Sequence, residues 1–157
     1  MEIKMVLFLP RDSLSVPVSR QVLDSCLETL GVTPDTRADI ALALSEACAN
    51  VIRHAGPGEE YEVQVSTIDR RCVIEVVNTG ARDGEPAPAS IAGAFLADDP
   101  VPLTAEHGRG LQIIDAVADN LELTSTDRRG TTVHFEKKLE WLPGAAGLYL
   151  FDVDGGS

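Results

Sequence analysis

The pattern of hydrophobic and polar positions predicts a strand and then a helix at the start of the chain. The first ten residues alternate loosely between apolar and polar side chains and end at a proline, which is typical of an edge strand. Ser15 or Val16 is expected to cap the helix, with Pro17 as its first residue and Gly31 at its end. Apolar side chains recur at helical spacing in between, at Val18, Val22, Cys26, Leu27 and Leu30.

A second helix is expected to begin at Thr33-Pro34 and to end near His54. Apolar residues surround almost all of it: Ile40, Ala41, Leu42, Ala43, Leu44, Ala47, Cys48, Ala49, Val51 and Ile52. We therefore expect this helix to be largely buried.

The polar residues of this second helix form a stripe. Glu46, Asn50 and His54 follow one another at positions i, i+4 and i+8, and they share one face with Asp39 and Arg53. A carboxylate, an amide and an imidazole along an otherwise buried helix are costly unless something polar lies opposite. The stripe is therefore either a solvated face of an amphipathic helix or the lining of a phosphate and magnesium site.

The rest of the chain alternates between short strands and a helix. β-Branched, alternating segments predict strands at residues 61–68, 72–78, 121–125 and 131–139. A helix is expected over 111–119, and the irregular, proline-containing segment 80–108 has the length of a functional lid or a disordered loop. The expected order is strand, two helices, two strands, lid, helix, two strands. The apolar tail that follows is expected to pack on the domain or on a partner.

Three further segments carry weaker signals of a binding site. Asn78 ends a strand beside Gly80, and Gly108 and Gly110 precede a helix, where backbone amides can face an anion. Residues 130–132, Gly-Thr-Thr, open the last strand. Each segment alone is also consistent with an ordinary turn.

Composition restricts the classes of function. The 157 residues, 44% of them apolar, suit one domain, and 13 basic against 25 acidic residues give a net charge of -12, which argues against nucleic-acid binding and favours a basic protein partner. No apolar run is long enough for a membrane span, and the first residues do not resemble a signal peptide, so a cytoplasmic location is expected.

The cysteines and histidines predict no metal centre of their own. The cysteines are far apart in apolar surroundings and are expected to be buried and reduced: Cys26, Cys48 and Cys72. The histidines are equally scattered: His54, His107 and His134. Any metal is therefore expected to arrive with a ligand.

Taken together and in this order, the four site segments resemble the ATP-binding signature of the Bergerat-fold (GHKL) family. The short chain is similar to its anti-sigma-factor serine/threonine kinase branch over residues 10–138. The resemblance implies an α/β fold, a two-layer sandwich in which helices cover one face of a mixed, mostly antiparallel β-sheet. It also implies an ATP-binding domain over 1–139 with a lid at about 81–107, followed by a C-terminal extension over 140–157.

The resemblance assigns roles to residues. It implies that Glu46 is the catalytic base and that Asn50 ligates Mg²⁺ through its amide oxygen, while the arginine at Arg20 contacts a partner protein. It implies nucleotide binding by Asn50, His54, Asn78, Gly80, Gly108, Arg109, Gly110, Leu111, Thr131 and Thr132.

Two positions depart from the family pattern. The adenine-reading aspartate is Asn78 here, and its oxygen can accept a hydrogen bond but carries no charge. Arg82 replaces a glycine, so it either crowds the backbone near the nucleotide or points toward a phosphate.

The resemblance implies an anti-sigma factor that binds and inhibits a sigma factor. With ATP and Mg²⁺ it would phosphorylate a serine or threonine of a STAS-type anti-anti-sigma antagonist, as a homodimer, without direct nucleic-acid or membrane contact. Three alternatives stay open: a partner-binding module inactivated at Asn78 and Arg82, a stand-alone sensor-kinase catalytic domain, and a nonenzymatic metabolite sensor. The absence of a phosphoacceptor helix from the sequence argues against the sensor kinase.

Overall fold

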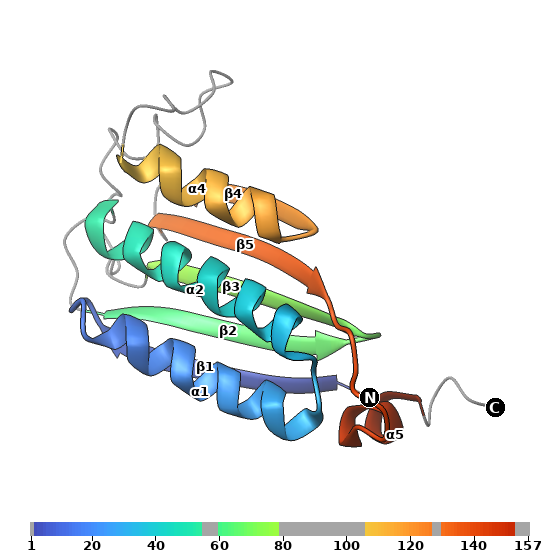
Figure 1. Ribbon diagram of the computed structural model, residues 1–157. Helices are drawn as coiled ribbons and strands as arrows, with labels where there is room; N and C mark the ends of the chain where they lie inside the picture. Colours follow the sequence, from blue (N-terminus) through green and yellow to red (C-terminus); the bar gives the residue numbers. More distant parts are fainter. Residues whose placement is uncertain (1, 55–59, 79–105, 127–129, 153–157) are drawn as a thin grey trace.

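The computed structural model describes residues 2–54, 60–78, 106–126 and 130–152, and within them the chain forms one sheet covered by helices on one face (Figure 1). The strands are β1 (Glu2–Pro10), β2 (Glu60–Ile68), β3 (Arg71–Asn78), β4 (Asn120–Thr126) and β5 (Gly130–Lys138). The helices are α1 (Ser15–Leu30), α2 (Pro34–His54), α4 (Glu106–Val117) and α5 (Ala146–Asp152). The predicted two-layer α/β fold is confirmed.

The strand order is β1-β2-β3-β5-β4, and every described pairing is antiparallel. Alternate side chains of each central strand face the helices, because successive side chains of a strand point to opposite faces. In β3 these are Cys72, Ile74, Val76 and Asn78, all of which are buried. The core between sheet and helices is built around Tyr61, Phe135, Leu44 and Ile74.

Helix α1 departs from the predicted pattern. It begins at Ser15, two residues before the predicted start, with Leu14 as N-cap. Val18 and Val22 are 52% and 38% exposed, whereas the buried face is Ser15, Ser19, Leu23, Leu27 and Leu30. The two buried serines are compatible with this face because each makes hydrogen bonds through its hydroxyl group.

Helix α2 has the predicted bounds, but it is not buried on every side. Leu42 is 43% exposed, because the helix lies on the outer layer of the sandwich and presents one side to solvent. The prediction of three buried cysteines is also wrong in part, since Cys48 and Cys72 are buried but Cys26 is only partly covered.

Helix α4 begins at Glu106, five residues before the predicted start, and ends two residues before the predicted end. Gly108 and Gly110 therefore lie inside the helix and do not precede it. Glycine is a weak helix former, but packing against a neighbouring helix overrides that preference, and α4 packs along α2.

The segment after β5 packs on the corner between α1 and α2. The Leu142 N–H donates to the Gly31 carbonyl at 2.8 Å, and the Thr33 N–H donates to the Glu140 carbonyl at 2.9 Å. Trp141 stacks near Phe151 of α5, with ring centroids 5.9 Å apart. The apolar tail thus packs on its own chain, one of the two outcomes that its composition predicts.

Candidate functional site

Four of the elements that carry the predicted site end or begin at the same end of the molecule. The C-terminal end of α2, the end of β3, the start of α4 and the start of β5 meet there, as Figure 1 shows. This follows from topology, because α2 packs on α4, β3 and β5. Segments distant in sequence are thereby brought around one region.

Asn50 is the most unusual residue of this region. It is 1% exposed, and neither its amide oxygen nor its amide nitrogen has a hydrogen-bond partner among the described residues. An unsatisfied buried polar group costs about 1–3 kcal/mol, so a ligand for this amide is expected. The carbonyl oxygen of an asparagine is a donor that Mg²⁺ accepts.

The remaining donors fit a magnesium ion that is bound together with phosphate. Across the described residues, no three His, Cys, Asp or Glu side chains gather into a group that could hold a metal. Mg²⁺ usually keeps several waters and takes only one or two protein ligands beside substrate phosphates. A single buried amide oxygen without a hydrogen-bond partner, such as that of Asn50, is consistent with this coordination preference.

Glu46 lies one helical turn before Asn50 and contacts α4 at Gly110. A Cβ atom placed on Gly110 would lie 3.0 Å from Oε2 of Glu46, so the absence of a side chain there makes room for the carboxylate. Gly110 is buried, and the next residue, Leu111, is a core residue that holds α4 against the sheet. The glycine inside α4 therefore sets how closely a carboxylate on α2 approaches this helix.

Asn78 lies at the end of β3 and is 2% exposed on the helix-covered face of the sheet. It shares that face with Val76, which pairs across to the buried Val133. The side chain at the aspartate position of the family pattern is thus buried at the same end of the molecule as Asn50.

Other predicted residues lie elsewhere or outside the described part. Gly80, Arg82 and most of the predicted lid lie outside the described residues, as do the side chains of His54, Arg109 and Thr131. Thr132 pairs with Val77 and lies on the sheet face opposite to Asn78. The structure therefore does not bring Thr132 to the amide of Asn50.

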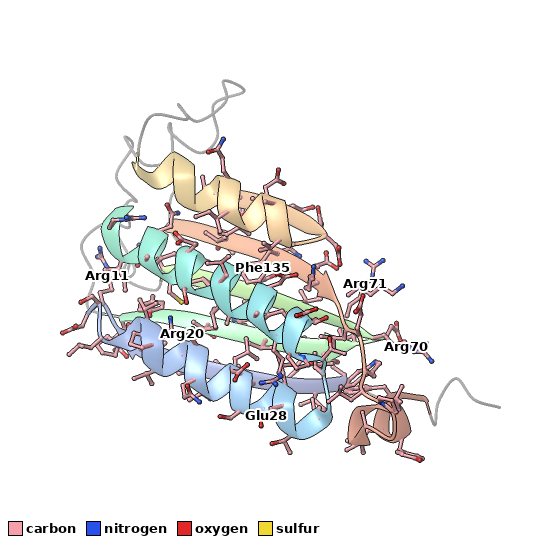
Figure 2. The ribbon with its side chains drawn as sticks, viewed as in Figure 1. Arg11, Arg20, Glu28, Arg70, Arg71 and Phe135 are labelled. Carbon is pink, nitrogen blue, oxygen red and sulfur yellow. The ribbon has the colours of Figure 1, made fainter. Side chains whose placement is uncertain are left out.

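Arg20 lies away from this group, on the exposed surface of α1 (Figure 2). Its Nη1 is 3.5 Å from Oγ of Ser45 on α2, and Ser45 in turn donates to the Ala41 carbonyl at 2.8 Å. The guanidinium remains accessible beside the α1–α2 seam, as a residue that contacts a partner must be.

A buried polar network beneath α2 was missed from the sequence. The hydroxyls of Tyr61 and Ser15 are 2.6 Å apart, and Oγ of Ser19 is 3.6 Å from Sγ of Cys48. Burial raises the pKa of Cys48 to about 11, although hydrogen bonds to Ser19 and Tyr61 act in the opposite direction. Cys48 is therefore a neutral thiol that ties α2 to α1 and β2 two residues before Asn50. The sequence signal for this network was the helical spacing of Ser15 and Ser19, together with a tyrosine, Tyr61, in a predicted strand.

Arg11 fixes the C-terminal end of α2. Its Nη2 donates to the Ile52 carbonyl at 2.8 Å, and burial lowers its pKa from the ordinary value. A cation at the end of a helix interacts favourably with the helix dipole and with its unpaired carbonyls. The loop after β1 thereby holds the last turn of α2 in place.

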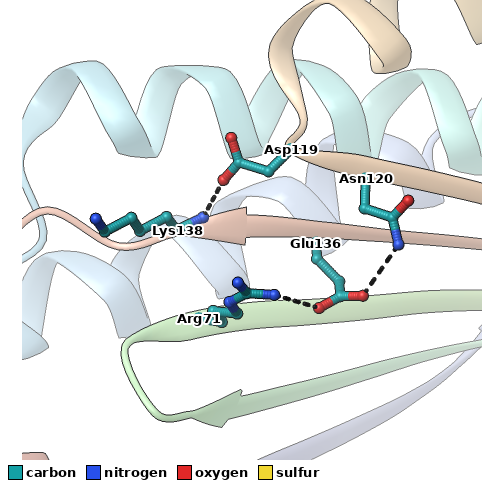
Figure 3. A pocket seen from close by; sticks show the side chains of 5 residues that line it. All are labelled: Arg71, Asp119, Asn120, Glu136 and Lys138. Carbon is teal, nitrogen blue, oxygen red and sulfur yellow. Dashed lines mark hydrogen bonds and ion pairs between the residues drawn. The ribbon is translucent and has the colours of Figure 1, made fainter.

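A pocket of about 210 Å³ lies at the opposite end of the molecule, lined by Arg71, Asp119, Asn120, Glu136 and Lys138 (Figure 3). Its charges satisfy one another: Asp119 accepts from the Lys138 backbone N–H at 2.6 Å, and Glu136 lies 3.6 Å from Arg71. Because these groups are mutually compensated and far from the α2 stripe, this pocket is not the predicted site.

Comparison with known proteins agrees with the fold. The family model of the histidine kinase-like ATPase domain matches residues 9–137. Serine-protein kinase RsbW of Bacillus mycoides is 24% identical over 139 residues, which covers 87% of this chain and 86% of that protein. RsbW of Bacillus velezensis is 26% identical over 134 residues, covering 83% and 82%.

Among solved structures, a chain of the SiaB–SiaC complex from Pseudomonas aeruginosa superimposes with a TM-score of 0.58 at 19% identity, covering 84% of this chain and 88% of that one. In the described part of the chain, no helix has both the length and the hydrophobicity to cross a membrane. The matched family segment runs from the last residues of β1 to the residue before the end of β5. The chain belongs to the histidine kinase-like ATPase domain family.

Proposed function

We propose that the protein is a cytoplasmic anti-sigma factor with serine/threonine kinase activity. It binds and inhibits a sigma factor, and it phosphorylates a STAS-type anti-anti-sigma antagonist with ATP and Mg²⁺. The family match and the RsbW relatives support nucleotide binding and kinase chemistry. The observation that carries the proposal is the buried, unpartnered amide of Asn50 beside the Glu46 carboxylate.

In this proposal the ATP-binding domain spans 1–139, with a lid at about 81–107 and a C-terminal extension over 140–157. Asn50 would hold a magnesium ion, which on binding neutralises phosphate charge. Asn78 would accept a hydrogen bond from the adenine amino group. The other nucleotide contacts would come from the residues that the resemblance assigns.

Glu46 is proposed as the base. Its carboxylate would accept the proton of the antagonist hydroxyl while that oxygen bonds to the terminal phosphorus and the bond from that phosphorus to ADP breaks. The products are ADP and a phosphorylated serine or threonine. Because Glu46 is partly exposed, a hydroxyl on a second protein can reach it.

The partner face is proposed on α1. Arg20 is exposed there, and Val18 and Leu14 are exposed apolar side chains on the same helix and its N-cap. An acidic chain with accessible apolar side chains suits a sigma factor with basic regions. Homodimerisation is part of the same proposal. The antagonist and the sigma factor would compete for one face of the protein.

Calorimetric titration of the purified protein with Mg²⁺-ATP tests the site. Asn50→Ala should abolish magnesium-dependent binding, and Asn120→Ala, an exposed asparagine at the other end, should not. Glu46→Gln should keep binding but lose phosphate transfer to the antagonist. Absence of binding by the wild-type protein would contradict the kinase proposal.

The second candidate is a partner-binding module without catalysis. Asn78, which lacks the negative charge of the family aspartate, favours it. This candidate predicts sigma-factor binding that is indifferent to ATP, and Asn78→Asp would then be expected to create ATP binding where the wild-type protein has none.

A further inference from the structure

Asn78 ends strand β3 next to polar but uncharged side chains. It is 2% exposed on the helix-covered face of the sheet, and Tyr61 of β2 lies directly opposite it in the register. Side chains in such a pair share one face and lie close together, with Cβ atoms about 4.5–5.5 Å apart. The hydroxyl of Tyr61 in turn contacts the hydroxyl of Ser15 and the thiol of Cys48. The amide of Asn78 therefore adjoins the buried polar network beneath α2.

This network is neutral near pH 7. Burial raises the pKa of the Cys48 thiol to about 11, and it raises the pKa of the Tyr61 hydroxyl above its ordinary value of 10. A buried carboxylate is costly in such surroundings, because no charge beside it replaces its lost solvation, whereas an amide carries no charge. The neighbours of position 78 thus suit an asparagine, and they suit an uncharged base better than a phosphate.

An asparagine and an aspartate read a purine base differently. A carboxylate only accepts hydrogen bonds, whereas an amide both accepts and donates them. Adenine presents an amino group, which is a donor, where guanine presents the carbonyl oxygen O6, which is an acceptor. A buried carboxylate that faces guanine therefore sets two acceptors against each other, and such a mismatch rejects the ligand. An amide avoids the mismatch, because half a turn about χ2 exchanges its oxygen and its nitrogen.

We propose that the nucleotide site accepts guanine as well as adenine nucleotides, and that Asn78 is the residue that relaxes the choice of base. The inference rests on the proposed function, in which Asn78 faces the base. With adenine, the amide oxygen accepts from the exocyclic amino group. With guanine, the turned amide donates an N–H to O6. The substrate class is then the purine nucleoside triphosphates with Mg²⁺, and not ATP alone.

Calorimetric titration of the full chain with Mg²⁺-ATP and, separately, with Mg²⁺-GTP tests this inference. The two dissociation constants of the wild-type protein should lie within about tenfold of each other, because the amide forms one hydrogen bond with either base. Asn78→Asp should raise the ratio of the GTP to the ATP dissociation constant by about tenfold or more, because the carboxylate faces an acceptor on guanine alone. Asn120→Asp makes the same change at an exposed asparagine of β4, at the opposite end of the molecule, and should leave the ratio unchanged.

A wild-type protein that binds ATP but binds GTP more than about tenfold more weakly would overturn the inference and leave the kinase proposal intact. This comparison does not depend on the folding of any variant. An unchanged ratio in Asn78→Asp would also overturn the inference, because the amide would then not be the group that faces the base. An equal rise of the ratio in Asn120→Asp would overturn it as well, since added negative charge would explain both results. If the wild-type protein binds neither nucleotide, the proposed function fails and the inference fails with it.

Discussion

The phenolic oxygen of Tyr61 on β2 lies 2.6 Å from Oγ of Ser15 at the start of α1, and both groups are buried. Ser15 uses its own proton to donate to the Asp12 carbonyl at 2.7 Å, so Tyr61 is the donor to Ser15. This bond joins the sheet to the first turn of the helix that carries Arg20.

Removing that donor should destabilise the fold. Tyr61→Phe is expected to lower the free energy of unfolding by about 1–2 kcal/mol, because a buried acceptor loses its partner while the ring still fills the core. Urea unfolding measures the change. Ser15→Ala and the double variant complete a cycle, in which additive effects would contradict a direct bond.

A methyl group on Gly110 should separate stability from catalysis. Gly110→Ala improves helix propensity by up to about 1 kcal/mol, and the partly exposed Glu46 can shift to make room, so unfolding should not become easier. The displaced carboxylate should nevertheless slow phosphate transfer by up to about 100-fold. Single-turnover transfer to the antagonist, read beside thermal unfolding, checks both effects. A variant that unfolds early and transfers normally would refute the proposed link between Gly110 and Glu46.

Stability should depend on pH through His134 on the open face of the sheet. Its Nδ1 is 3.0 Å from Glu75 on β3 and its Nε2 is 3.3 Å from Glu136, while Glu122 of β4 pairs with it in register. Burial alone lowers the pKa of His134, but the hydrogen bonds to Glu75 and Glu136 outweigh it and raise the pKa above 6.5. The hydrogen bond from His134, helped by Asn120, lowers the pKa of Glu136 below 4.5.

The directions of these two pKa shifts define the pH range in which the interaction stabilises the fold. When folding raises the pKa of a histidine, the resulting stabilisation is fully present below the pKa of the unfolded state. It is lost as the pH rises through the pKa of the folded state. When folding lowers the pKa of a glutamate, the resulting stabilisation is present above the pKa of the unfolded state. It is lost as the pH falls through the pKa of the folded state. The free-energy difference between wild type and His134→Gln should therefore be larger at about pH 5.5 than at about pH 8. A difference that grows toward alkaline pH would contradict this assignment.

The thiols should differ in reactivity. Burial raises the pKa of Cys48 to about 11 and that of Cys72 to about 12, so neither forms the thiolate that reacts with iodoacetamide near neutral pH. Cys26 is only partly covered. Mass spectrometry should find Cys26 modified first in the native protein and all three modified in urea. Early modification of Cys48 would contradict the closed packing under α2.

The tail contact depends on a glycine in α5. A Cβ on Gly147 would overlap the ring of Trp141, so Gly147→Ala is expected to cost about 1–3 kcal/mol through overpacking. Trp141 is the single tryptophan of the chain, so its fluorescence during urea unfolding reports the change directly. Ala146→Ser, at the exposed neighbouring position, should leave the transition in place.

The sequence predicted most of the fold, because alternation and helical spacing are local signals. The bounds of α2 and, within the described residues, the order of the strands and helices are confirmed, and the end of α1 at Gly31 follows from its φ of 93°. The face of α1 could not be predicted, since Ser15 and Ser19 are buried only by partners distant in sequence. The predicted start of α4 was wrong for the same reason, because its glycines are helical through contact with α2.

For the candidate site, spacing alone predicted the Glu46–Asn50 stripe, and the buried amide of Asn50 agrees with the polar lining that the stripe suggests. The position of Gly110 against Glu46 could not be predicted, because it depends on the distance between two helices. The approach of Arg53 to α4 could not be predicted either, although Arg53 shares the stripe in sequence.

The contact between residues 140–142 and the α1–α2 corner has a consequence for biosynthesis. The carbonyl of Gly31 and the N–H of Thr33 receive their partners from a segment more than a hundred residues later in the chain. A ribosome-bound chain can form α1 and α2 early but cannot close this corner until the C-terminal segment emerges. The growing chain therefore exposes the apolar surface beneath Trp141 until residues 140–142 have left the ribosome, and it is in that interval that a chaperone would find it.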